Sequence, residues 1–130
     1  MGKKVLVVDD NPDARLFSSS VVEECGHSAL EAANGEEGLE MVKANKPDLI
    51  ILDVLMPKQS GLRMYREMMQ AKSLKHIPII MLSGVAKTTF LRSQKALTEF
   101  GGLKVPEPEV YLEKPVESEK LTSVIKKILG

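Results

Sequence analysis

The sequence predicts an α/β protein in which a parallel sheet of five strands carries helices on both faces. Strand-like and helix-like segments alternate five times along the 130 residues, and this alternation is typical of a parallel sheet built with right-handed crossovers. Several strand-like segments are unbroken apolar runs, as expected of strands that are covered on both faces. The length suits one domain and is too short for two.

The first part of the chain is predicted to hold two strands with a helix between them. Residues 4–8 are a lysine followed by valines and a leucine, and they form the first strand. Asn11 is a good helix N-cap and Pro12 suits the first helical position, so a helix begins here. Gly26 ends this helix, since glycine favours the position just after a helix. Residues 28–32 form a second, weaker strand.

Two further strands and helices follow in alternation. A short helix begins at Asn34-Gly35, and residues 48–52, which are apolar after Asp48, form the third strand. Residues 61–72 carry apolar side chains at helical spacing. Residues 78–82 form the fourth strand.

The last part of the chain is predicted to hold a long helix, a short strand and a final helix. Apolar residues between positions 90 and 100 predict the long fourth helix. Residues 110–112 are the fifth strand, and Ser118 is predicted to cap the final helix. The apolar stripe of that final helix consists of Leu121, Val124, Ile125, Ile128 and Leu129.

The composition excludes several classes of function. Lysine plus arginine and aspartate plus glutamate number 18 each, so the net charge favours neither nucleic acid nor an anionic membrane surface as a partner. Cys25 is the only cysteine, which excludes an intrachain disulfide and a thiolate metal cage. No apolar run approaches the roughly 20 residues of a membrane helix, and the start does not resemble a signal peptide. We therefore expect a cytoplasmic protein.

Polar residues gather where the predicted strands end. Asp9 and Asp10 follow the first strand, Asp53 the third and Ser83 the fourth, and Lys114 comes shortly after the fifth. The carboxyl ends of parallel strands share one edge of the sheet, where ligands bind in folds of this class. Each of these residues alone is more often a turn, cap or solvated side chain, so the prediction depends on their shared edge.

The three aspartates predict a site for a hard cation. Neighbouring carboxylates repel one another unless a cation lies between them, and carboxylates without histidine or cysteine nearby favour Mg²⁺ or Mn²⁺ over zinc. Such a site suits phosphoryl transfer with Asp53 as the nucleophile, because a carboxylate can form an aspartyl-phosphate. Lys114 and Ser83 would then contact the phosphate oxygens.

Four motifs, VVDDN, LDVLMPKQSG, MLSG and YLEKP, together resemble the receiver domain of two-component response regulators. The likeness is to the chemotaxis type, in which a single receiver domain (here residues 1–130) makes up the protein, and a receiver cut from a longer chain is the alternative. The resemblance implies a flavodoxin-like, doubly wound (βα)5 sandwich with strand order 2-1-3-4-5. It also implies a signalling switch rather than an enzyme, since a receiver catalyses only its own phosphorylation and dephosphorylation.

The resemblance assigns roles to the acidic residues. Asp53 matches the phospho-acceptor, and Asp9 and Asp10 match the acidic pair that holds Mg²⁺ together with Asp53 and the backbone carbonyl of Leu55. Mn²⁺ could substitute for Mg²⁺. The family's second acidic position is the direct ligand, so Asp10 should matter more for metal affinity than Asp9. Removing either aspartate should also stabilise the metal-free protein by relieving repulsion.

Other residues match the moving parts of the family's switch. Ser83 matches the hydroxyl residue that turns toward the phosphoryl group, Tyr111 the aromatic residue that swings inward, and Lys114 the lysine that pairs with the phosphoryl group. The Lys114–Pro115 peptide bond is expected to be cis.

The resemblance also implies partners. A histidine kinase or a histidine phosphotransfer protein would supply the phosphoryl group. A downstream protein would bind the face made by the fourth helix, fifth strand and fifth helix. Neither nucleic acid nor a membrane is expected as a direct partner, and the implied state is a monomer or weak dimer.

The chain departs from the family pattern in two places. Ser83 and Tyr111 lie farther apart than in a typical receiver, which suggests an insertion at residues 98–109. It is either a neutral loop or a partner-specific surface. Leu55 and Val85 are apolar where a polar side chain could hold an attacking water, so slow loss of the phosphoryl group is expected.

The sequence also bears on three other functions. A haloacid-dehalogenase-type phosphohydrolase would need a second aspartate where Leu55 stands. A flavodoxin-like nucleotide or flavin binder would place its phosphate beside Asp9 and Asp10, which would repel it. A receiver-like interaction module that is never phosphorylated stays open, although the intact acidic set argues against it.

Overall fold

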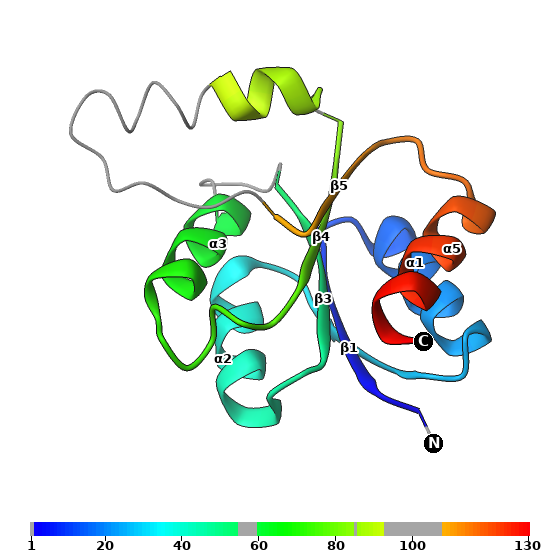
Figure 1. Ribbon diagram of the computed structural model, residues 1–130, viewed down its shortest axis with the longest axis horizontal. Coiled ribbons are helices and arrows are strands. Elements are labelled where there is room, and N and C mark those ends of the chain that lie inside the picture. Colours follow the sequence, from blue (N-terminus) through cyan, green and yellow to red (C-terminus); the bar gives the residue numbers. More distant parts are fainter. Residues whose placement is uncertain (1, 55–59, 85, 93–107) are drawn as a thin grey trace.

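A computed structural model of the protein describes residues 2–54, 60–84, 86–92 and 108–130. Five parallel strands form one sheet in the order β2-β1-β3-β4-β5 (Figure 1). The strands are β1 (Lys4–Val8), β2 (Ser28–Ala32), β3 (Leu49–Asp53), β4 (Ile79–Ser83) and β5 (Val110–Glu113). The helices are α1 (Pro12–Glu24), α2 (Gly35–Asn45), α3 (Ser60–Gln70) and α5 (Ser118–Leu129), and residues 87–92 are helical as well. The predicted fold class and strand order are confirmed.

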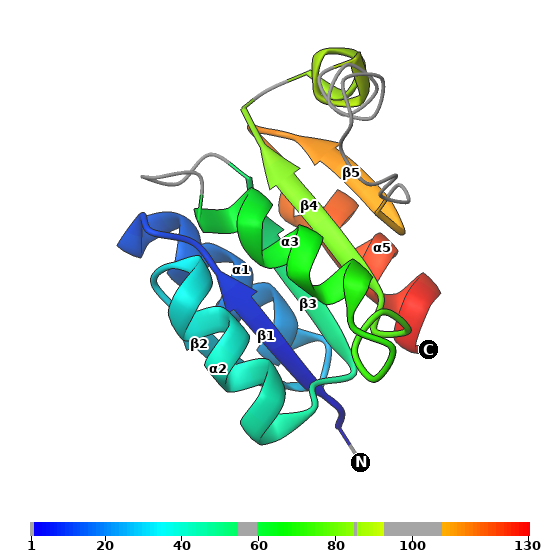
Figure 2. The same cartoon turned by 90° about the vertical axis from the view of Figure 1, so that its left-hand side faces the viewer.

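The sheet has a separate hydrophobic core on each face. Helices α2 and α3 cover one face and α1 and α5 cover the other (Figure 2), because successive side chains of a strand point to opposite faces. The core on the α2–α3 side includes Leu6, Val8, Ile50, Leu52, Met81, Val42 and Met64. The core on the α1–α5 side includes Val5, Val7, Leu49, Ile51, Ile80, Val21 and Leu121. The central strands are therefore buried on both faces, which explains their unbroken apolar sequence.

The start of α1 agrees with the sequence, whereas the start of α5 does not. Asn11 Oδ1 accepts hydrogen bonds from two backbone N–H groups of the first turn, at 2.9 and 3.0 Å, and Gly26 has a left-handed φ of 86° just past the helix end. The predicted cap at Ser118 is wrong. Glu117 holds the N-cap position and makes no side-chain capping bond within the described part of the chain. Its negative charge still suits the positive end of the helix dipole.

Gly38 lets α2 approach α3 and β1 closely. A Cβ at this position would lie 2.7 Å from Met64 Sδ and 3.1 Å from Val8 Cγ2, which is closer than ordinary van der Waals contact. A larger residue would therefore push the α2 and α3 helices apart.

The observed β3 extends one residue farther than predicted, so Asp53 is its last residue. In the described ranges of the chain, no helix combines the length and apolar character needed to cross a bilayer.

Candidate functional site

The sheet brings the three predicted aspartates together at the carboxyl ends of β1 and β3. These strands are neighbours, and Val8 lies opposite Leu52 in their register, so the next residues, Asp9 and Asp53, come side by side. One carboxylate oxygen from each of Asp9, Asp10 and Asp53 lies within 4.8 Å of the others. Asp9 and Asp53 are 3% and 6% exposed, whereas Asp10 is exposed to solvent.

Lys114 reaches this acidic cluster from the loop after β5. Its Nζ lies 3.0 Å from Asp9 Oδ2 and 3.5 Å from Asp53 Oδ2. Its backbone N–H donates to the carbonyl of Ser83 at 2.7 Å, which anchors the loop to the end of β4. The Lys114–Pro115 peptide bond is cis. A positive charge therefore lies between the two buried carboxylates and offsets part of their repulsion.

Every polar group of Asp9 has a partner. Its backbone N–H donates to the carbonyl of Ala32 at 3.1 Å, and its carbonyl accepts from Arg15 Nη1 at 2.8 Å. Its Oδ1 accepts from the backbone N–H of Asn11 at 3.0 Å, and Oδ2 accepts from Lys114. In the described ranges, Asp10 by contrast makes no hydrogen bond or ion pair. The structure thus fixes Asp9 rigidly and leaves Asp10 open.

Ser83 is the last residue of β4 and Tyr111 lies in β5, the two strands that follow β3 in the sheet. Ser83 is fully buried, and its side chain is hydrogen-bonded to the Tyr111 hydroxyl. Burial raises the pKa of Tyr111, the hydrogen bond with Ser83 acts in the opposite direction, and the negative charges of Glu113 and Asp53 raise it further. The hydroxyl is therefore neutral at physiological pH.

Two contacts connect this region to the helix at residues 87–92. The ring of Tyr111 packs against buried Phe90, with centroids 5.3 Å apart and planes inclined by 35°. The side chain of Glu113 accepts a hydrogen bond from the backbone N–H of Lys87 at 2.9 Å. A rearrangement of β5 would thus change contacts at the start of this helical segment, at Lys87, and in its middle, at Phe90.

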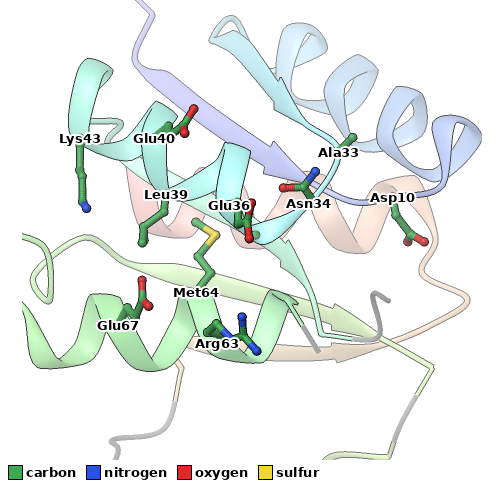
Figure 3. Close-up of a pocket in the computed structure, with 11 residues that line it drawn as sticks. Asp10, Ala33, Asn34, Glu36, Leu39, Glu40, Lys43, Arg63, Met64 and Glu67 are labelled. Carbon is green, nitrogen blue, oxygen red and sulfur yellow. The ribbon is translucent and has the colours of Figure 1, made fainter. Parts of the chain in front are cut away.

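The acidic cluster is accessible from two sides. A groove with a volume of about 670 Å³ runs between α2 and α3 and reaches Asp10. Figure 3 shows Asp10 at the end of β1, with Met64 and Arg63 of α3 facing the α2 side of the groove. A second cavity of about 390 Å³ lies beside α1 and is lined by Asp9, Phe17 and Lys114 among others.

The donor set fits a hard divalent cation. Three carboxylate oxygens lie close enough to bind one ion, and two aspartates come from buried positions whose charge is only partly offset by one lysine. Oxygen ligands of this kind suit Mg²⁺ or Mn²⁺, which keep several waters and need few protein ligands. Of the predicted ligands, the carbonyl of Leu55 lies outside the described residues, as do Val85 and most of the predicted insertion at residues 98–109.

Sequence reasoning missed three residues that support the site: Arg15, Glu31 and Phe90. Arg15 bonds the carbonyl of Asp9 and its Nε pairs with Glu31 Oε1 at 3.1 Å. The position of Arg15 within the first turns of the helix after the aspartate pair is the one signal that could have identified it. Nothing in the sequence identifies Glu31 as the ion-pair partner of Arg15, or Phe90 as the residue that packs against Tyr111.

Comparison with known proteins agrees with this architecture. The polar-differentiation response regulator DivK of Brucella anthropi is 28% identical over 130 residues, which cover 100% of this chain and 98% of that protein. The structure of chemotaxis protein CheY4 of Vibrio cholerae matches with a TM-score of 0.80 at 28% identity, over 99% of this chain and 100% of that chain. A putative response regulator from Chloroflexus aurantiacus matches with a TM-score of 0.78 at 30% identity, over 99% and 98% of the two chains.

The family model of the response regulator receiver domain matches residues 5–126, which is nearly the whole chain. The order of its strands and the cluster of aspartates at their carboxyl ends agree with that match. This chain therefore belongs to the response regulator receiver family of two-component signalling.

Proposed function

We propose that the protein is a phospho-accepting switch and that Asp53 is its acceptor. The observation that carries this proposal is the environment of Asp53, a nearly buried carboxylate at the end of a central strand with Lys114 Nζ 3.5 Å away and Asp9 beside it. A carboxylate in this setting has a cation ready to contact the oxygens of a transferred phosphoryl group. An ordinary exposed turn aspartate would lack this feature.

The proposed reaction is a transfer from a phosphohistidine of a histidine kinase or phosphotransfer protein. An Asp53 carboxylate oxygen attacks phosphorus, the P–N bond to histidine breaks, and the histidine nitrogen keeps the bonding electron pair. Asp9, Asp10 and Asp53 would hold Mg²⁺, which when bound supplies positive charge next to the transferred group. Lys114 is placed to move its ammonium group from the carboxylates to a phosphoryl oxygen, a charge-assisted contact.

The proposed output is a change in the contacts of Ser83 and Tyr111. A phosphoryl group on Asp53 offers new acceptor oxygens, and Ser83 is the buried hydroxyl at the end of the adjacent strand. If Ser83 turns to that group, its hydrogen bond with Tyr111 is lost, and the Tyr111 ring can move against Phe90. The face formed by residues 87–92, β5 and α5 would then change its affinity for a downstream protein.

The protein is proposed to act through protein partners, as a monomer or weak dimer, in the cytoplasm. A monomer or weak dimer, with no direct binding to nucleic acid or membrane, fits a switch that acts through protein contacts. The cytoplasmic location remains a prediction from the sequence. A receiver-like module that is never phosphorylated is the competing function.

The test is mass spectrometry of the intact protein after incubation with acetyl phosphate and MgCl₂. We expect the wild-type protein to gain the mass of one phosphoryl group, in a linkage that hydroxylamine cleaves. Asp53→Asn keeps the shape of the side chain and should fold normally but gain no mass. If wild type gains none, the unphosphorylated module is favoured, and if Asp53→Asn is labelled like wild type, the acceptor is wrongly assigned.

A further inference from the structure

We propose that Arg15 is a positioning residue for the carboxylates that bind the divalent cation. The inference rests on the proposed function, because it concerns the same acidic cluster. Arg15 lies on α1, and its side chain is 21% exposed. It bonds the backbone carbonyl of Asp9 at 2.8 Å through Nη1 and Glu31 at 3.1 Å through Nε. One guanidinium thus links α1, the end of β1 and the end of β2.

The bond to the carbonyl of Asp9 determines where Asp10 lies. The peptide unit between Asp9 and Asp10 is planar, so the direction of the Asp9 carbonyl also sets the direction of the Asp10 N–H and the position of its Cα. Among the described residues, the side chain of Asp10 has no partner of its own. Its approach to within 4.8 Å of the other two aspartates therefore depends on the backbone that Arg15 holds.

The charge of Arg15 does not compete with a metal ion. Among the described residues, its only ion pair is with Glu31, and none of its nitrogens is bonded to a carboxylate oxygen of the acidic cluster. The two opposite charges of this pair largely cancel. The pair therefore acts on the acidic cluster by fixing the position of its backbone rather than by its electrostatic field. Loss of a group that orients a metal ligand typically lowers metal affinity by about 10- to 100-fold.

Positioning and simple electrostatics predict opposite effects for Arg15→Ala. Removing a positive charge near the acidic cluster strengthens Mg²⁺ binding if only the field matters. Releasing the Asp9 carbonyl weakens it, and we expect a loss of about tenfold in affinity. Arg15→Lys keeps the charge, but a single ammonium cannot reproduce the planar two-point contact, so it should also weaken binding. The control is Arg63→Ala, because Arg63 lines the groove at Asp10 and touches none of the aspartates by an ion pair (Figure 3).

The measurement is an NMR titration of the ¹⁵N-labelled proteins with MgCl₂, with urea unfolding to confirm that each variant is folded. We expect weaker Mg²⁺ binding for both Arg15 variants and unchanged or tighter binding for Arg63→Ala. Wild-type or tighter Mg²⁺ binding by Arg15→Ala overturns the positioning role. If wild type itself binds no Mg²⁺ or takes up no phosphoryl group, the proposed function has failed instead.

Discussion

Asp9 and Asp10 are adjacent in the sequence, but replacing each with alanine should shift the stability of the metal-free protein in opposite directions. Asp9 is buried and accepts hydrogen bonds from Lys114 at 3.0 Å and from the backbone of Asn11 at 3.0 Å. Asp10 is exposed and makes no such bond within the described residues. The sequence alone predicted a gain for both variants, because it shows only the repulsion between like charges.

The magnitudes follow from these contacts. Each hydrogen bond to a charged group contributes about 1.5–3 kcal/mol, and the Asp9→Ala variant loses two. Relief of repulsion is partly cancelled, since at any one dielectric constant a carboxylate 4.8 Å away repels Asp9 less strongly than the Lys114 ammonium at 3.0 Å attracts it. Lys114 also keeps its contact with Asp53. We therefore expect Asp9→Ala to lose about 1–3 kcal/mol of unfolding free energy, because the N–H of Asn11 and the ammonium of Lys114 each lose an acceptor, and the exposed Asp10→Ala to gain up to about 1 kcal/mol.

The assay is urea unfolding of the three proteins in EDTA, monitored by circular dichroism. A matched titration with MgCl₂ should show the larger loss of metal affinity in Asp10→Ala, because Asp10 is the aspartate of the cluster without a competing partner among the described residues. An Asp9→Ala protein that is as stable as wild type, or more so, would show that repulsion outweighs the two hydrogen bonds. Equal stabilisation by both changes would refute the distinction between a fixed and an open aspartate.

Three further predictions concern packing, titration and lifetime. Gly38→Ala should lose about 1–3 kcal/mol of stability in urea unfolding because its Cβ crowds α3, whereas Gly84→Ala, where a Cβ meets nothing within 4 Å, should be nearly neutral. Absorbance at alkaline pH should show that the pKa of Tyr111 lies above the ordinary tyrosine value of 10.0. The contribution of this residue to the free energy of unfolding is complete at lower pH and should be lost as the pH rises through the raised pKa. A pKa at or below the ordinary value contradicts this prediction. The double variant Leu55→Asn with Val85→Glu should lose its phosphoryl group about tenfold faster than wild type once the donor is removed, and an equal decay rate would exclude these residues as the cause.

The sequence predicted the fold well because its strongest signals are local. Unbroken apolar runs identified the buried strands. Asn11 marked the start of α1 through its capping side chain, and Gly26 marked the end through a left-handed backbone that few other residues adopt. The start of α5 was misjudged at Ser118, because a residue that often caps a helix is present one position after the observed N-cap. Strand order came from the resemblance to receivers, since local patterns do not determine which strands pair.

The composition of the site was also predictable, but its internal differences were not. The shared edge of a parallel sheet explains why Asp9, Asp53 and Lys114 meet. The contrast between Asp9 and Asp10 depends on which way each side chain leaves the extended backbone and on Arg15, a residue that in a sequence looks like any solvated arginine of a helix. Such long-range contacts appear only once β1, β2 and α1 are packed together.

Charge balance supports the proposal that the acidic cluster uses both Lys114 and a divalent cation when it accepts a phosphoryl group. Three aspartates and one lysine carry a net charge of −2 (−3 + 1). Converting the Asp53 carboxylate to an acyl phosphate of about −2 makes the net charge of the cluster more negative, about −3, in a largely buried place. A bound divalent cation makes it less negative, about −1. Since the phosphorylated cluster is the more negative, it should bind the cation more tightly, and by linkage the cation favours phosphorylation to the same degree. The carboxylate of Asp10 suits this role because a cation arriving from solvent can bind there without breaking a contact to any residue that the structure describes.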